Sequence, residues 1–326
     1  MQPAPRVTIG MPVYNGERFL REALDSLLAQ TFTDFELVIS DNASEDATGA
    51  ICTAYAGLDS RVRYLRQDIN HGAAWNHNRV VEEARGELFK LACYDDVCDP
   101  AMIAACVQAL DRHPEAVLAY PRTRMMMRGD MSTLQEYTSD MELSSPSAAM
   151  RFGDLIDEAP PSFPLFGVVH LAALRKTPLF ESYKASDRVV LVRLALAGPF
   201  VEAQEAVFYY RWHDNNATKL VAEPARFYQW WDPAAGSGRV FPETRLLYEY
   251  FRSLWIMKLS LRERRECARE IRFWYQFQKP SIKWELKGLL GRRRTAEPPR
   301  STYVEQLVRR ARRKQIKQRL YPLGTD

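Results

Sequence analysis

Two adjacent carboxylates, Asp95 and Asp96, follow an apolar run that predicts a buried strand over residues 87–93. Because an open α/β sheet binds its ligands outside the carboxyl ends of its strands, this pair stands where a substrate would bind. Hard divalent cations such as Mg²⁺ and Mn²⁺ take carboxylate oxygens and bridge them to substrate phosphates. Successive strand residues point to opposite faces, so the two acids can reach different parts of one ligand, for example metal and ribose. The pair therefore predicts a metal–diphosphate site; the alternative is a solvated turn before Pro100.

The segments around this pair alternate between strand and helix patterns. Short apolar runs predict strands, over residues 7–13, 35–40, 62–66, 87–93 and 116–120. Apolar residues at helical spacing lie between them, and this alternation indicates a doubly wound, mostly parallel α/β sheet. Residues 121–160 show little periodicity, so we expect an irregular stretch that either covers an acceptor or lies on the surface. A helix over 186–198, a strand over 206–210 and a helical, aromatic and basic segment from residue 241 follow.

The composition is ordinary for a soluble globular protein, since 46% of the 326 residues are apolar and 26% are charged. No N-terminal segment resembles a signal peptide, and no apolar run reaches the roughly 18 residues that a spanning helix needs. The five cysteines are an odd number scattered among periodic segments, which is typical of reduced thiols rather than of a disulfide framework. We therefore expect a cytoplasmic protein.

Basic side chains gather near the C-terminus. Residues 281–326 hold 13 Lys/Arg against 4 Asp/Glu, whereas the whole chain has a net charge of only +4. Residues 304–320 predict a basic amphipathic helix, which could lie on an anionic membrane surface at the inner face of the cytoplasmic membrane. The alternative is a solvated helix packed on the rest of the chain. Charge alone would also suit nucleic acid, but no nucleic-acid-binding module is recognisable, so we expect no such partner.

Five segments in order resemble glycosyltransferase family 2, whose members are inverting enzymes of the GT-A fold that use nucleotide sugars. They are PVYNGERFLREALDSLLAQTF at 12–32, ELVISDNASEDAT at 36–48, NHGAAWNHNRVVEEARGELFKLACYDD at 70–96, ASDRVVLVRLALAGPFVE at 185–202 and VFYYRWHDNNAT at 207–218. The resemblance implies a GT-A glycosyltransferase domain over residues 1–218. Residues 219–326 lie outside it, and we expect a mostly helical, basic C-terminal extension there.

The resemblance also implies which residues bind the nucleotide-sugar donor. The chain from Pro12 to Tyr14 and the carboxylate of Asp41 would hold the nucleoside, although Asp41 can equally form an Asx-turn or a helix cap with the residues that follow. Asp95 would contact both the donor and the metal ion, and Asp96 would be a second ligand of the metal ion. Asn78 would hydrogen-bond the loop backbone near the donor.

Three residues further along the chain complete the implied site. Asp187 opens a predicted helix, and in the family an acid at this place deprotonates the acceptor; a helix-capping carboxylate is the alternative. Arg211 would contact the diphosphate. His213 would complete the metal sphere, although a lone His is more often a packed or surface residue.

One position departs from the family pattern. Members often carry an acid two positions before the pair, where this chain has Cys93. Zinc is not expected there, because Cys93 and Cys98 without further thiols or a nearby His make a poor tetrahedral set. The resemblance implies a metal-dependent transfer of sugar, with UDP as the favoured nucleotide, to a hydroxyl of a saccharide or lipid-linked acceptor in surface-polysaccharide or glycolipid assembly. The alternatives are a catalytically silent, membrane-associated nucleotide-sugar-binding protein and a nucleotidyltransferase.

Overall fold

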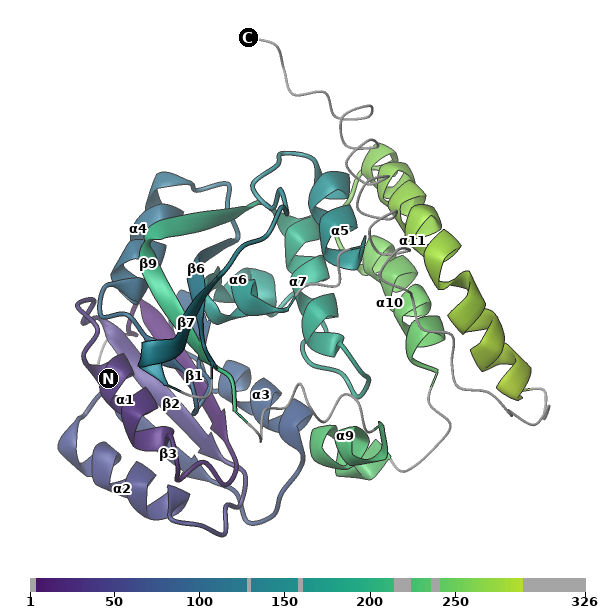
Figure 1. Ribbon diagram of the computed structural model, residues 1–326. Helices are drawn as coiled ribbons and strands as arrows, with labels where there is room; N and C mark the ends of the chain where they lie inside the picture. The colour runs from purple at the N-terminus through teal and green to yellow at the C-terminus, as the bar shows by residue number, and fades with distance from the viewer. Residues whose placement is uncertain (1–3, 128–129, 158–160, 214–223, 236–240, 290–326) are drawn as a thin grey trace.

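The computed structural model describes residues 4–127, 130–157, 161–213, 224–235 and 241–289, and Figure 1 shows how they are layered. Within these residues one nine-stranded sheet has the strand order β3-β2-β1-β4-β8-β6-β9-β5, and β7 pairs with β6. The strands are β1 (Val7–Val13), β2 (Phe35–Asp41), β3 (Val62–Arg66), β4 (Leu88–Leu91), β5 (Val97–Cys98), β6 (Leu118–Met126), β7 (Leu134–Tyr137), β8 (Val168–His170) and β9 (Phe200–Arg211). The α-helices are α1 (Leu20–Leu28), α2 (Thr48–Leu58), α3 (Ala73–Glu82), α4 (Met102–Arg112), α5 (Ala148–Asp157), α6 (Leu171–Leu174), α7 (Ser186–Ala197), α9 (Pro224–Trp231), α10 (Pro242–Ile256) and α11 (Leu261–Leu289).

The first four strands form a parallel half-sheet whose carboxyl ends lie at one edge. β1 pairs in parallel with β2 and β4, and β2 pairs in parallel with β3. Every residue of β1 and β2 is buried. The reason is that helices cover both faces: α3, α5 and α7 contribute to one hydrophobic cluster and α1, α2 and α4 to the other. This arrangement confirms the predicted α/β fold class, and the register sets Val13 beside Asp41 at the edge where the predicted site lies.

The stretch predicted to be irregular, residues 121–160, is largely ordered secondary structure, so that prediction is wrong for its described part. β6 continues to Met126 and pairs with β7, and α5 is buried along its whole length. The prediction missed β8 as well, which lies antiparallel between β4 and β6. β8 has three residues, and Pro121 stands at a shift in register between β6 and β9. Such short or interrupted strands depend on packing against their neighbours, which local periodicity does not reveal.

The C-terminal helices pack on the helices α5 and α7 that cover one face of the sheet. α10 lies against α7, and α11 lies against both α5 and α10, as Figure 1 shows. The rings of Tyr250 and Trp274 meet edge to face at 5.2 Å inside the cluster that also contains α7. No helix among the described residues is long and apolar enough to cross a membrane. The domain boundary between residues 218 and 219 stays a prediction, and the predicted amphipathic helix over 304–320 lies outside the described residues.

Candidate active site

A cavity of about 600 Å³ opens at the carboxyl ends of β1, β2 and β4. Five of the predicted site residues line it: Pro12, Tyr14, Asp95, Asp96 and Asp187. They come from the first strand, from the loop after β4 and from the start of α7, so the fold brings together segments far apart in the sequence. The other four predicted residues do not line this cavity and make internal contacts instead.

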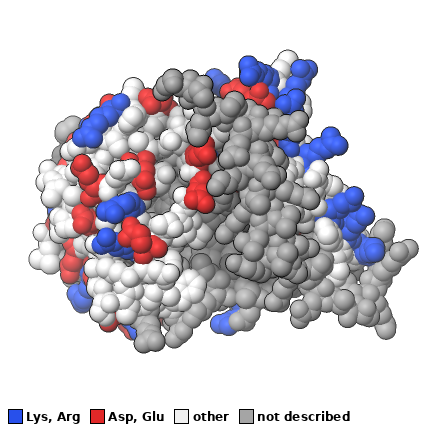
Figure 2. Space-filling view, turned by 45° about the horizontal axis from the view of Figure 1, so that its top comes forward, with Lys and Arg blue, Asp and Glu red and all other residues white. Residues whose placement is uncertain are grey.

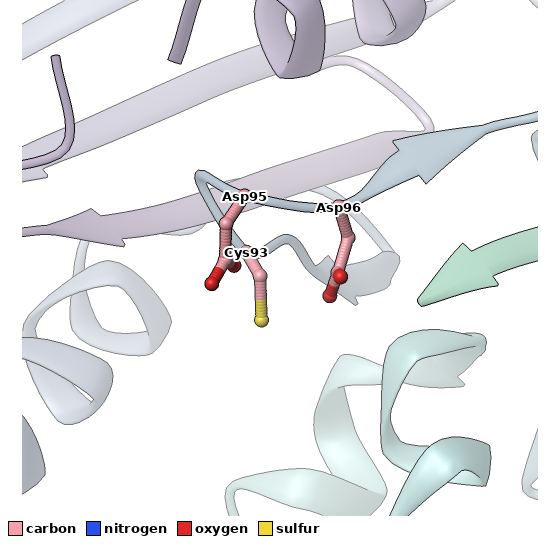
Figure 3. A group of neighbouring side chains, drawn as sticks. All are labelled: Cys93, Asp95 and Asp96. Carbon is pink, nitrogen blue, oxygen red and sulfur yellow. The ribbon is translucent and has the colours of Figure 1, made fainter. Parts of the chain in front are cut away.

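Cys93, Asp95 and Asp96 lie in the loop that joins β4 to β5, and Figure 3 shows their side chains projecting to the same side of that loop. One ligand atom from each lies within 4.8 Å of the others, which is a spacing that a single cation can bridge. Oδ1 of Asp96 accepts a hydrogen bond from the backbone N–H of Arg211 at 2.8 Å. Its other oxygen, Oδ2, is buried and has no hydrogen-bond partner among the described residues.

This electrostatic arrangement suits a divalent cation. Burial and the neighbouring charge of Asp95 raise the pKa of Asp96 well above its ordinary value. A bound cation would relieve both costs, because it would supply a partner for the orphaned oxygen and offset the like charges. Burial also raises the pKa of the Cys93 thiol, so sulfur offers this cluster a weaker ligand than the usual carboxylate. The two acids therefore fit an Mg²⁺ or Mn²⁺ ion. Because of Cys93, the set of possible metal ligands holds one carboxylate fewer than the usual family pattern.

His213 and Arg211 support the acid pair from the end of β9. Nε2 of His213 lies 2.9 Å from Oδ2 of Asp95, and the His213 side chain is largely buried. Nε of Arg211 donates to the backbone carbonyl oxygen of Asp95 at 2.7 Å, and its terminal nitrogen pairs with Glu22 at 2.6 Å. These contacts hold the Asp95–Asp96 loop against β9. The predicted contact of Arg211 with a diphosphate stays a prediction, since its described partners belong to the protein.

A second cavity, of about 1110 Å³, lies beside the carboxyl ends of β2 and β3 and shares Tyr14 and Asn70 with the first. Asp41 does not line it but supports its wall. Oδ2 of Asp41 accepts from the hydroxyl of Tyr64 and from Arg66, each at 2.7 Å, and both of these side chains line the cavity. Oδ1 accepts from the backbone N–H of Ser44 at 2.8 Å, which is the Asx-type contact that the sequence left open. Nucleoside contact by Asp41 itself stays a prediction.

Asp187 lies in the first turn of α7 and faces the first cavity. Ser162 donates its hydroxyl hydrogen to Oδ2 of Asp187 at 2.7 Å, so the carboxylate is held from one side. The helix cap is Ala185, whose φ of 65° turns the chain sharply into the helix, and not Asp187. The carboxylate is therefore available to the cavity while it still benefits from the N-terminal end of the helix dipole.

Asn78 braces the wall rather than lining it. Its Nδ2 donates to the carbonyl oxygen of Phe180 at 2.9 Å, and its Oδ1 accepts from the N–H of Phe180 at 3.0 Å. These two bonds tie α3 to the loop that precedes α7. The sequence predicted a backbone hydrogen bond by Asn78, and direct donor contact is untested.

Two cations beside Asp187 were not predicted. Lys184 and Arg188 both line the cavity. Burial lowers the pKa of Lys184, and Nε of Arg188 is buried without a hydrogen-bond partner among the described residues. A cavity that holds two such cations is suited to an anionic group. The available signal in the sequence was a basic residue on either side of Asp187: Lys184 lies three positions before it and Arg188 one position after it.

One wall of the cavity is aromatic, and its rings on α9 were not predicted as part of the site. It includes Trp212 after β9 and three rings of α9: Phe227, Trp230 and Trp231. Phe227 and Trp231 stack with their ring planes 15° apart, and Nε1 of Trp231 donates to the carbonyl oxygen of Glu181 at 2.9 Å. Flat, anchored aromatic rings suit the apolar C–H faces of a sugar. The Trp230–Trp231 pair in the sequence was the signal for this wall.

Comparisons with known proteins agree with this geometry. The family model described as glycosyl transferase family 2 matches residues 8–179. Glycosyltransferase GlyG from Streptococcus pneumoniae is 33% identical over 102 residues, which are 31% of this chain and 34% of GlyG. The uncharacterized glycosyltransferase EpsJ from Bacillus subtilis is 33% identical over 109 residues, which are 33% of this chain and 31% of EpsJ. The chain thus spans about a third or less of the length of the curated relatives that head the comparison.

Two solved structures share the fold over most of their length. S. aureus TarS 1–349 in complex with UDP-GlcNAc has a TM-score of 0.57 at 14% identity, and the match covers 95% of this chain and 92% of TarS 1–349. The mannosyltransferase PcManGT from Pyrobaculum calidifontis, in complex with GDP-Man and Mn²⁺, has a TM-score of 0.52 at 15% identity, covering 99% and 89%. At these identities the likeness concerns the fold alone, and it confirms the predicted GT-A-type architecture.

Proposed function

Since the chain belongs to glycosyl transferase family 2, we propose that it transfers a sugar from a nucleotide diphosphate to a hydroxyl group of an acceptor, with inversion at the anomeric carbon. The observation that carries this proposal is the common cavity of Asp95, Asp96 and Asp187. Asp95 and Asp96 can hold a cation together with a diphosphate. Asp187, from a different element, lines the same cavity and can act as the base. Nucleotide-sugar complexes of TarS and PcManGT, which share the fold, support a donor of this class.

The donor end of the reaction needs charge neutralisation. Asp95 and Asp96 would hold an Mg²⁺ or Mn²⁺ ion, which supplies a Lewis acid for the leaving diphosphate. Lys184 and Arg188 add two fixed positive charges to the same cavity. Such preorganised charge stabilises the negative charge that develops as the sugar–phosphate bond breaks. Tyr64, Arg66 and the backbone near Tyr14 would hold the nucleoside in the adjoining cavity.

The acceptor end needs a base. Asp187 would take the proton from the acceptor hydroxyl while the oxygen of that hydroxyl bonds to the anomeric carbon. The bond between this carbon and the phosphate oxygen breaks at the same time, and its electron pair leaves with the nucleoside diphosphate. Ser162 would keep the Asp187 carboxylate turned toward the acceptor. The aromatic wall on α9 would hold the sugar faces and exclude water.

Donor and acceptor identities are finer proposals. We favour UDP, and the UDP-GlcNAc complex of TarS supports it, whereas the GDP-Man complex of PcManGT keeps GDP open and dTDP is the third choice. For the acceptor we propose a saccharide or lipid-linked hydroxyl in surface-polysaccharide or glycolipid assembly. One observation favours a rival function, that of a catalytically silent nucleotide-sugar-binding protein. Cys93 stands where family members often carry a further acid beside the proposed metal site.

Calorimetric titration of the purified chain with UDP, GDP and dTDP, with and without Mn²⁺, tests the donor site. We expect tight binding of one nucleotide that requires the metal and disappears in the Asp95→Asn, Asp96→Asn double variant. Asp34→Asn, an exposed acid away from the cavity, is the matched control. Metal-dependent release of that nucleotide from its sugar donor then separates an enzyme from a silent binder. Tight nucleotide binding without any release, with saccharide acceptors present, would favour the silent protein.

A further inference from the structure

One side of α10 exposes large apolar side chains to solvent. Tyr248, Phe251 and Trp255 are 58%, 44% and 72% exposed, and their spacing of three and four residues sets them along one stripe of the helix. Leu261, at the start of α11, extends the stripe and is 71% exposed. Scattered single apolar residues on a surface are normal, but a stripe of aromatic rings on one helix indicates a contact surface. The opposite side of α10 is already buried against α7 and α11.

Charges on α10 and α11 are segregated by sign. Among the described residues 241–289, nine Lys and Arg residues are exposed, whereas none of the six Glu residues is. Three of these acids are buried, and two of them have partners inside the molecule: Glu249 pairs with Arg193 in the core, and Glu285 accepts from the N–H of Thr244. Figure 2 shows Lys and Arg side chains along the edge of the molecule that α11 forms. The outward face of these two helices is therefore positive.

The cations lie among the aromatic rings rather than apart from them. The guanidinium carbon of Arg264 lies 5.2 Å from the centre of the Trp255 ring, and that of Arg245 lies 5.5 Å from the Tyr248 ring. Aromatic rings with a polar edge settle at the headgroup level of a bilayer, and arginine pairs with lipid phosphates. We propose that the α10–α11 face, formed by this aromatic stripe and the exposed cations of both helices, docks on an anionic lipid bilayer.

Charge complementarity favours an anionic bilayer over other partners for this face. Residues 290–326 carry eleven Lys/Arg and three Asp/Glu, so the chain's own C-terminal segment would be repelled from a positive face. A second copy that docked through the same face would present the same positive charge. A nucleic acid would match the charge but not the exposed aliphatic residues, Ile256 and Leu261. The proposal does not depend on the glycosyltransferase activity.

Flotation of the full chain with vesicles tests the surface. We expect the protein to float with vesicles of phosphatidylcholine containing 30% phosphatidylglycerol, to stay behind with pure phosphatidylcholine, and to be released by salt. The Phe251→Ser, Trp255→Ser variant should bind at least tenfold more weakly. The Arg265→Gln, Arg269→Gln variant should lose about fivefold for each cation removed. Leu58→Ser and Arg112→Gln, which change an exposed apolar residue and an exposed cation far from this face, should bind as the unaltered chain does.

Circular dichroism checks that the exposed substitutions leave the fold intact. No flotation of the unaltered chain with the anionic vesicles overturns the proposal. Unchanged flotation of both surface variants does so too, and it would assign docking to another segment. Equal flotation with pure phosphatidylcholine contradicts the role of the cations, and retention of a DNA oligonucleotide in place of vesicles would assign the face to nucleic acid.

Discussion

Nε2 of His213 lies 2.9 Å from Oδ2 of Asp95, a residue 118 positions earlier in the chain. The contact connects the end of β9 with the loop after β4. If a cation binds beside Asp95, as we propose, a ring nitrogen in this place would bind it or orient the carboxylate, and either role would tighten metal binding. The fold thus assembles the candidate metal site from two segments that sequence spacing alone does not connect.

Replacing His213 should therefore weaken the metal site without removing it. We expect His213→Ala to lower the affinity for Mn²⁺, measured by calorimetry in the presence of UDP, by about 10- to 100-fold. His113→Ala is the control, because the His113 side chain is exposed and its described contact is with Glu115, away from the cavity. Unchanged Mn²⁺ affinity in His213→Ala would leave His213 with a packing role.

Asp96 should make the stability of the metal-free chain depend on pH. Burial raises the pKa of Asp96 above the unfolded value of about 3.9, so the folded state holds this proton more tightly than the unfolded state does. The contribution of Asp96 to the free energy of unfolding must then fall as pH rises from about 4 through the folded pKa. Asp96→Asn removes that charge. In EDTA we expect the variant to melt at a higher temperature than the unaltered chain at neutral pH, and to show no increase in melting temperature when Mn²⁺ is added. A lower melting temperature for the variant in EDTA would contradict this account.

Asp187 should affect turnover rather than donor binding. Removing a general base typically costs about 10²- to 10⁴-fold in rate, so Asp187→Asn should lower kcat within that range while KM for the donor stays nearly constant. Ser162→Ala should cause a smaller loss of kcat, because Ser162 only holds the carboxylate. Asp34→Asn controls for the change of an acid to an amide. A loss confined to donor KM in Asp187→Asn would argue that the residue binds the donor instead.

Lys184 and Arg188 should contribute to the binding of UDP but not to the binding of uridine, which has no phosphates. If these cations face the leaving diphosphate, Lys184→Gln and Arg188→Gln should each weaken UDP binding by about tenfold, the cost of one charge-assisted hydrogen bond, and leave uridine binding unchanged. Arg112→Gln is the control for loss of a cation. If all three variants bound UDP equally well, we would assign the two cations to the acceptor side of the cavity.

The sequence predicted the parts of the site that follow from local pattern. Asp95 and Asp96 stand after a continuous apolar run, and strand ends in an alternating α/β sheet meet at one edge, so their position followed from periodicity. Asp187 was identified through the family resemblance, which implies an acid at the start of this helix, and that resemblance rests on five segments in order.

The rest of the site depends on contacts between distant segments. Arg211 pairs with Glu22, 189 residues away, and no local pattern shows that its guanidinium is engaged there. Asp41 is surrounded by Tyr64 and Arg66 from the neighbouring strand, which only the pairing of β2 with β3 brings close. Three rings of the aromatic wall belong to α9, whose position follows from packing near α3 and not from its own sequence.

A buried ion pair joins the helix that carries Asp187 to the C-terminal helices. Arg193 of α7 and Glu249 of α10 are both fully buried and lie 2.6 Å apart. The pair belongs to a network, since Glu249 also pairs with Arg245 and Arg252, and Arg193 also pairs with Glu181. Removing one partner of an isolated buried pair typically costs about 3–5 kcal/mol, and the remaining arginines offset part of that cost here. Arg193→Met should therefore lower the free energy of unfolding by an amount near the lower end of that range in urea denaturation, and the Arg193→Met, Glu249→Met double variant should recover part of the loss. Arg262→Met, which breaks a largely exposed pair with Glu266, should cost about 1 kcal/mol or less. If Arg193→Met cost no more than Arg262→Met, the C-terminal helices would not depend on this pair for their attachment to α7.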